Sequence, residues 1–250
     1  MEIFKGTNYV KIFGVKIDKV TMDEAYNRVV GFIQSESECK LVFTPNPEFV
    51  MKAQEDVEFK EILCQGDLVV ADGIGLIKAS KIHHLELPER VPGIELMEKT
   101  LEYCNRSKKS IFLFGGKPGV TDKAAKKIVE KYPNIVVKGT QNGYYDEKDE
   151  LKILDKINEA KADVLFVGLG SPRQEKWLNR HKKILNTKVA FGIGGAMDVW
   201  ADVAKRAPKL FIDLGLEWFY RLLKEPSRIG RMMVLPKFMI KVIFAKTIDH

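Results

Sequence analysis

The strongest constraint on the fold is a strand, turn and helix unit that recurs along the chain with glycine in the turn. Three apolar runs each lead into a glycine-rich turn, at 115–119, 168–172 and 192–196. Short apolar runs bounded by glycine indicate buried strands. Because a helix that joins two parallel strands makes a right-handed crossover, the alternation predicts a Rossmann-like α/β fold, an open, mainly parallel sheet with helices on both faces.

The remainder of the chain continues this alternation. Its 250 residues, 45% of them hydrophobic, suffice for one large core, expected over 1–202, with an appendage over 203–250. The segment Thr21–Glu24 is a capping box that begins a helix, and Asn46 followed by Pro47 begins another. The other expected elements are strands at 9–17, 40–43, 110–114, 135–138, 163–167 and 188–191, and helices at 74–83, 94–106, 120–131, 149–160 and 173–182.

An acidic residue follows one of the apolar runs. Leu68–Ala71 is long enough for a buried strand and leads directly into Asp72, before a helical pattern from Ile74. Ligands of open parallel sheets bind at the carboxyl ends of the strands, so Asp72 is placed for chemistry. The structural alternative is that Asp72 caps the following helix.

The glycine-rich turns favour a phosphate-bearing ligand but match no common nucleotide motif. Glycine lets the backbone approach a ligand, and helix N-termini offer N–H groups to anions. The turns at 168 and 192 lack the third glycine of a dinucleotide fingerprint, and the chain has neither a P-loop nor an Asp-x-Asp metal motif. Ser171–Gln174 has the pattern of a capping box with proline at the first helical position. The pair His83 and His84 is expected at the surface.

Cysteine content and hydropathy predict a cytosolic protein. Three widely spaced residues, Cys39, Cys64 and Cys104, indicate buried thiols rather than a disulfide frame or a zinc site. We expect no signal peptide, and no apolar stretch is long enough to span a bilayer.

Positive charge is concentrated at the end of the chain. Residues 201–250 carry ten lysines and arginines against five acids, +5 of the total +7. Beyond residue 229 the cations alternate with large aliphatic residues, which is typical of a helix in an anionic membrane interface. Docking on the core or on another subunit is the alternative, and the two are compatible. A nucleic-acid-binding module is a further alternative, although this tail lacks aromatic residues suited to stacking bases.

Successive motifs along the chain carry a family resemblance. They are Thr44-x-Asn46-Pro-Glu48, Val70–Gly75, Pro88–Gly93, Phe114-Gly-Gly with Pro118-Gly119, Gly168–Glu175, Gly192–Ala196 and Lys205–Pro208. In this order they resemble the WecG/TagA/CpsF glycosyltransferases over roughly residues 10–230, most closely the wall teichoic acid branch. Pro92 departs from the pattern, since alanine is more usual there.

The resemblance implies an inverting transferase that moves N-acetylmannosamine from UDP-ManNAc to the 4-hydroxyl of GlcNAc on undecaprenyl diphosphate, a β-1,4 linkage of the wall teichoic acid linkage unit. It also implies a peripheral enzyme on the inner face of the plasma membrane, an anionic lipid surface as partner, and self-association into a homo-oligomer. We expect no metal, no other cofactor and no nucleic acid. The alternative is a related transferase that uses another UDP-hexosamine, such as UDP-ManNAcA, for exopolysaccharide or enterobacterial common antigen-type glycans.

The resemblance also implies roles for individual residues. Asp72 is the expected general base, because an inverting transfer needs one group to take the acceptor proton. Thr44 and Arg90 join it as catalytic residues, with Arg90 gripping a phosphate. The expected substrate-binding residues are Asn46, Gln174, Gly115, Gly116, Gly170, Arg221, Arg228 and Arg231. Gln174 would read the donor sugar if its side chain is not used in the capping box, and the last three arginines would fold over the active site.

Overall fold

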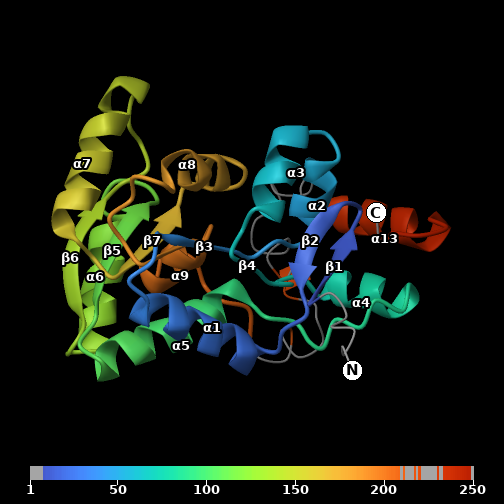
Figure 1. Cartoon of the computed structure of the whole chain (residues 1–250), viewed down its shortest axis with the longest axis horizontal. Coiled ribbons are helices and arrows are strands. Elements are labelled where there is room, and N and C mark those ends of the chain that lie inside the picture. Colours follow the sequence, from blue (N-terminus) through green and yellow to red (C-terminus); the bar gives the residue numbers. More distant parts are fainter. Residues whose placement is uncertain are drawn as a thin grey trace, which may run out of the picture.

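A six-stranded parallel sheet forms the centre of the protein (Figure 1). The computed structural model describes residues 8–208, 211, 217, 219–220, 230 and 233–248. The strand order is β4, β3, β8, β7, β5, β6, and every neighbouring pair is parallel. The strands are β3 (Lys40–Phe43), β4 (Leu68–Val69), β5 (Ser110–Gly115), β6 (Val136–Gln141), β7 (Val164–Gly168) and β8 (Val189–Gly192). The predicted Rossmann-like sheet is confirmed.

Two hydrophobic cores lie on opposite faces of the sheet, because successive side chains of a strand point in opposite directions. In β5, Ile111 and Leu113 belong to one core, and Phe112 and Phe114 belong to the other. The first core is built with α1 (Met22–Gln34), α5 (Gly93–Arg106), α6 (Val120–Lys131) and α9 (Ala196–Trp200). The second is built with α2 (Pro47–Ala53), α3 (Val57–Cys64), α4 (Ile74–Ile82), α7 (Glu150–Ala160), α8 (Arg173–His181) and α13 (Val234–Phe244).

The two ends of the chain meet on the side of β4. A hairpin of β1 (Tyr9–Ile12) and β2 (Val15–Asp18) is antiparallel, and the Asp18 carboxylate accepts a hydrogen bond from the Val69 N–H at 2.8 Å. The Phe13 N–H donates to the Ile248 carbonyl at 2.8 Å. Helix α13 packs on α2 and α4 through Phe238 and Val242, both fully buried (Figure 1). The last helix is therefore docked on the core, which was one of the two predictions for this segment; the other was contact with a membrane interface.

Most predicted helix starts are confirmed, and one is wrong. Thr21 and Glu24 form both bonds of the capping box, and Asn46 caps α2 with Pro47 in its first turn. The segment Ser171–Gln174 is not a capping box: Pro172 occupies the cap position of α8, and no side chain caps this helix. The Gln174 amide is instead engaged by a residue of the turn after β8. Helix α3 and the 3-10 turn η1 (Glu147–Asp149) were not predicted.

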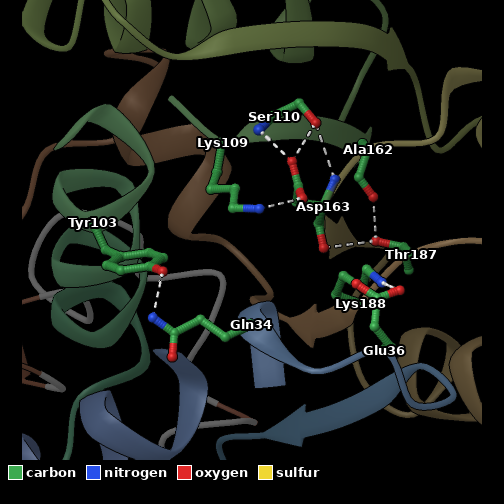
Figure 2. Close-up of polar contacts among 9 residues, drawn as sticks. All are labelled: Gln34, Glu36, Tyr103, Lys109, Ser110, Ala162, Asp163, Thr187 and Lys188. Carbon is green, nitrogen blue, oxygen red and sulfur yellow. Dashed lines mark hydrogen bonds and ion pairs between the residues drawn. The ribbon is translucent and has the colours of Figure 1, made fainter. Parts of the chain in front are cut away.

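Acidic residues hold the amino ends of the strands together. Asp163, just before β7, accepts hydrogen bonds from the Ser110 N–H at 2.8 Å and the Ser110 hydroxyl at 2.7 Å, and pairs with Lys109 at 3.3 Å (Figure 2). Asp67, before β4, binds the Leu41 N–H at 2.9 Å in the same way. Burial alone would raise the pKa of Asp163, but these partners outweigh it and the pKa is lowered. This edge of the sheet is closed by its own side chains.

Within the described residues, no helix combines the length and the apolar character needed to cross a bilayer.

Candidate active site

A cavity of about 380 Å³ lies at the carboxyl ends of the strands, opposite the edge closed by Asp163. Its lining follows four strands: β3, β4, β7 and β8. Six predicted site residues line it together: Thr44, Asn46, Asp72, Arg90, Gly170 and Gln174. The chain therefore gathers most of the predicted site at the edge where ligands of parallel sheets bind.

The remaining predicted residues are placed differently. Gly115 is the last residue of β5 and Gly116 follows it, and both lie outside the cavity lining. Gly115 has φ +132°, and a Cβ there would lie 2.3 Å from the Gly168 carbonyl oxygen. Close packing of two turns thus accounts for glycine at this position, and a role in substrate binding stays a prediction. Arg221, Arg228 and Arg231 lie outside the described residues.

Asp72 faces the cavity from a backbone anchored to the sheet. Strand β4 ends at Val69, and the Asp72 N–H then donates to the Pro45 carbonyl at 3.0 Å. The Asp72 side chain keeps 28% of its surface exposed. The following helix, α4, has Gly73 at its cap and no side-chain cap bond, so the capping alternative for Asp72 is wrong. Gly73 is required there, because a Cβ would lie 2.4 Å from the Pro47 ring.

Arg90 is the cation of the site. Its Nε donates to the Asp72 carbonyl at 2.6 Å, and its NH2 group lies 3.4 Å from the Asp72 carboxylate. The loop that carries it is tied to the sheet by a bond from the Val91 N–H to the Ala71 carbonyl. Burial works against the charge of Arg90, but Asp72 and Glu217 outweigh it, and the pKa of Arg90 is raised. Arg90 therefore stays charged beside the cavity.

Glu217 is a site residue that the sequence did not reveal. It comes from the C-terminal region, is 8% exposed, and accepts a 2.8 Å hydrogen bond from the same NH2 group of Arg90. It also lines the cavity. The only available signal was an acid in a tail rich in cations, and nothing local pairs it with a residue 127 positions earlier.

Thr44 and Asn46 form the wall that follows β3. Thr44 lies against the start of α5, where a Cβ on Gly93 would be 2.9 Å from its hydroxyl oxygen. The side-chain oxygen of Asn46 accepts bonds from the N–H groups of Glu48 and Phe49, at 2.8 and 3.2 Å. Because that oxygen is used as the helix cap, the amide nitrogen of Asn46 is the atom left for a substrate.

Comparison with known proteins identifies the family. The Glycosyl transferase WecG/TagA/CpsF family profile matches residues 10–249. The chain belongs to this family. An N-acetylglucosaminyldiphosphoundecaprenol N-acetyl-beta-D-mannosaminyltransferase of Staphylococcus aureus (strain MRSA252) is 38% identical over 244 residues, covering 96% of this chain and 94% of the relative. The protein of the same name from strain MW2 is 37% identical with the same coverage.

In this WecG/TagA/CpsF glycosyltransferase, the side-chain amide of Gln174 is buried and forms most of its hydrogen bonds with other groups of the protein. It is 1% exposed; its oxygen accepts from the Gly194 N–H at 3.1 Å and its nitrogen donates to the Glu175 carboxyl at 2.6 Å. Only one N–H of its amide remains for a donor sugar. Contact between Gln174 and substrate stays a prediction.

In the part of the chain that the structure describes, no group of three His, Cys, Asp or Glu side chains could hold a metal ion. His83 is half-buried, and its Nε2 lies 2.8 Å from the Val242 carbonyl of α13, so it does not lie free at the surface as expected. His84 is exposed, as predicted.

Proposed function

We propose that the protein transfers N-acetylmannosamine, with inversion, from UDP-ManNAc to the 4-hydroxyl of GlcNAc-diphosphoundecaprenol in wall teichoic acid linkage-unit synthesis. Family membership supports glycosyl transfer, and the names of the staphylococcal relatives support this sugar and this acceptor. The observation that carries the chemistry is the Asp72 carboxylate, which lies beside Arg90 in a cavity at the carboxyl edge of the sheet.

In this mechanism Asp72 is the general base. Its carboxylate takes the proton of the acceptor 4-hydroxyl while that oxygen forms a bond to the anomeric carbon of the donor. The bond from the anomeric carbon to the UDP oxygen breaks on the opposite face, and its electrons leave with UDP. The products are UDP, a protonated Asp72 and a lipid-linked disaccharide in which the configuration at the anomeric carbon of the transferred sugar is inverted. The partly exposed side chain of Asp72 can then return its proton to water.

Arg90 receives the charge that develops on the leaving diphosphate. Because Nε and NH2 of Arg90 already bond Asp72 and Glu217, its NH1 group is, within the described residues, the donor left for a phosphate oxygen. A group fixed in advance needs no reorganisation during the reaction. The bonds from Arg90 to the Asp72 carbonyl and to Glu217 hold it in this way. The predicted contacts of Arg221, Arg228 and Arg231 would add cations, and no step above depends on them.

Helix α13 is the proposed membrane contact. Its inner side is buried in the core, while Ile240, Ile243 and Phe244 keep 57, 61 and 82% of their surface exposed. Lys237 is exposed on the same helix. An apolar helical face with flanking cations binds an anionic lipid interface, which would bring the cavity to the headgroup of a lipid-linked acceptor.

Vesicle flotation tests this contact. We expect wild-type protein to float with phosphatidylglycerol vesicles, and the triple variant Ile240→Ser, Ile243→Ser, Phe244→Ser to stay in solution. A matched triple, Val129→Ser, Leu151→Ser and Ile184→Ser, removes exposed apolar residues elsewhere and should float normally. Equal flotation of both triples would refute the assignment of α13.

The activity itself is tested with purified protein, UDP-ManNAc and a soluble lipid-diphosphate-GlcNAc analogue. We expect release of UDP together with a β-1,4-linked disaccharide product. Parallel reactions with UDP-ManNAcA and UDP-GlcNAc decide between the proposal and the alternative donor. Turnover with either of these and none with UDP-ManNAc would overturn the choice of sugar.

A further inference from the structure

A buried carboxyl lies behind the wall of the cavity and has no part in the mechanism above. Glu175, in the first turn of α8, is 0% exposed. One carboxyl oxygen, Oε1, accepts the 2.6 Å bond from Gln174, and the other, Oε2, has no hydrogen-bond partner among the described residues. Burial raises the pKa of Glu175 to about 7. A buried carboxyl with one oxygen that lacks a hydrogen bond lowers the stability of the fold, which suggests that Glu175 has a further role.

Glu175 sets the orientation of the neighbouring amide. The Gly194 N–H needs an acceptor, and the oxygen of Gln174 supplies it at 3.1 Å. If the Gln174 amide were reversed, two N–H groups would face each other and both would lose their bonds. The Oε1 atom of Glu175 prevents this, because it accepts only from the nitrogen side of the amide.

The bonded chain from Glu175 ends in a wall of the cavity. Ile193, Gly194 and Gly195 all line the cavity, and Gly194 has φ +51°, in the left-handed region. The two glycine-rich turns also touch, since a Cβ on Gly168 would lie 2.9 Å from the Gly194 carbonyl oxygen. The position of Gly194 therefore decides how the turn after β8 meets the turn after β7.

Gly192 supplies independent support for the same arrangement. A Cβ at Gly192 would lie 2.9 Å from the Gln174 nitrogen and 3.1 Å from Glu175 Oε1. The last residue of β8 must therefore be small for the pair to occupy this space. Both the strand end and the helix start are built around the Glu175–Gln174 contact.

We infer that Glu175 is a positioning residue, which fixes the Gln174 amide and through it the Gly194 turn against which the nucleotide donor binds. That a nucleotide donor binds against this turn rests on the proposed function. A turn that is already ordered before the donor binds lowers the entropy lost on binding. Loss of the Glu175 contact should therefore weaken donor binding and leave the proton transfer at Asp72 unchanged.

The test uses the full-length protein and two readouts. Hydrogen–deuterium exchange measures how well the Gly194 amide is protected from solvent. Calorimetric titration with UDP measures the affinity of the cavity for the nucleotide. We expect Glu175→Leu and Gly192→Ala each to speed exchange at Gly194 and weaken UDP binding by about tenfold, the equivalent of one lost hydrogen bond. Glu175→Gln keeps an acceptor oxygen for Gln174 and should stay within about twofold of wild type.

Gly31→Ala is the matched control for Gly192→Ala, because a Cβ on Gly31 would meet no atom within 4 Å. If Glu175→Leu does not fold, Gly192→Ala and Glu175→Gln still decide the question. Unchanged exchange at Gly194 in Gly192→Ala, or equal losses in Glu175→Gln and Glu175→Leu, would overturn the inference. Failure of the wild type to bind UDP would instead count against the proposed donor, and the exchange comparison would still test Glu175.

Discussion

An aspartate that contacts a basic side chain lies at each end of the parallel sheet, and the surroundings of the two aspartates differ. At the amino end, Asp163 is surrounded by Ser110 and Lys109, which together supply three contacts to its carboxylate (Figure 2). At the carboxyl end, Asp72 lies 3.4 Å from Arg90, but its side chain borders a cavity of about 380 Å³.

The difference shows what separates a structural acid from the proposed catalytic one in this fold. Asp163 bonds the first residue of a neighbouring strand and so stabilises the sheet. The closest bond of Arg90 to a carboxylate is to Glu217 at 2.8 Å, not to Asp72. Contact between an acid and a base is therefore not enough to indicate an active site; Asp72 differs from Asp163 because it borders a space large enough for substrate.

Asp72→Asn gives the largest expected loss. Removing the general base should lower the transfer rate by about 10²- to 10⁴-fold, with little change in melting temperature. The matched variant Asp163→Asn should show the reverse, normal turnover and a lower melting temperature. Steady-state kinetics and thermal melts of both variants check this, and equal behaviour of the two would remove the distinction between the two ends.

Arg90→Gln should come next, with a loss of about 10²-fold in kcat, because a fixed donor to the leaving diphosphate is removed. Arg106→Gln is the control, since Arg106 lies outside the cavity lining and, in the part of the chain that the structure describes, bonds only the hydroxyl of the half-buried Tyr26. If Arg90→Gln raised KM and left kcat unchanged, Arg90 would bind the donor equally in the ground state and the transition state, and would not act on the leaving group alone.

Asp163 also predicts a pH dependence of stability. Its pKa is lowered in the folded protein, so the ionised carboxylate stabilises the fold above the unfolded value near 4, and this is lost as the pH falls through the folded value. We expect Asp163→Asn to cost about 1 to 3 kcal/mol at pH 7 and progressively less below about pH 4. Denaturant melts across this range would show it; a constant difference would assign the loss to packing.

Chelation should have the smallest effect. The sequence has no Asp-x-Asp motif, and the proposed mechanism assigns the leaving-group charge to arginines. We expect EDTA to change the transfer rate by less than about twofold. A large loss that added Mg²⁺ or Mn²⁺ restores would mean that a metal, and not Arg90, meets the diphosphate.

Much of the fold could be predicted because its signals are local. Apolar runs such as 110–114 read directly as strands, and Thr21 and Asn46 each cap the helix that follows within three residues. The Ser171–Gln174 pattern failed because Gln174 has a competing partner, Gly194, that only the assembled sheet brings near. Local propensity decides an element when no distant group offers a better bond.

Several residues of the cavity could be predicted from the sequence, but Glu217 and the pairings between residues could not. Resemblance and strand-end position identified Asp72, Arg90 and Thr44, all of which line one cavity. The contact between Arg90 and Glu217 spans 127 residues, and the contact between the Gly194 N–H and Gln174 spans 20. Such contacts depend on the tertiary arrangement, which no spacing pattern encodes.

The central claim is that the Asp72 carboxylate takes the proton of the acceptor hydroxyl. A crystal structure of the protein with UDP-ManNAc and the soluble GlcNAc acceptor analogue, trapped as the inactive Asp72→Asn variant, tests it most directly. The account predicts that the side-chain oxygen of residue 72 lies about 3 Å from the acceptor 4-hydroxyl, with the diphosphate on the opposite side of the anomeric carbon. A side chain at position 72 that contacts neither sugar, with another acid or histidine at the hydroxyl, would contradict it.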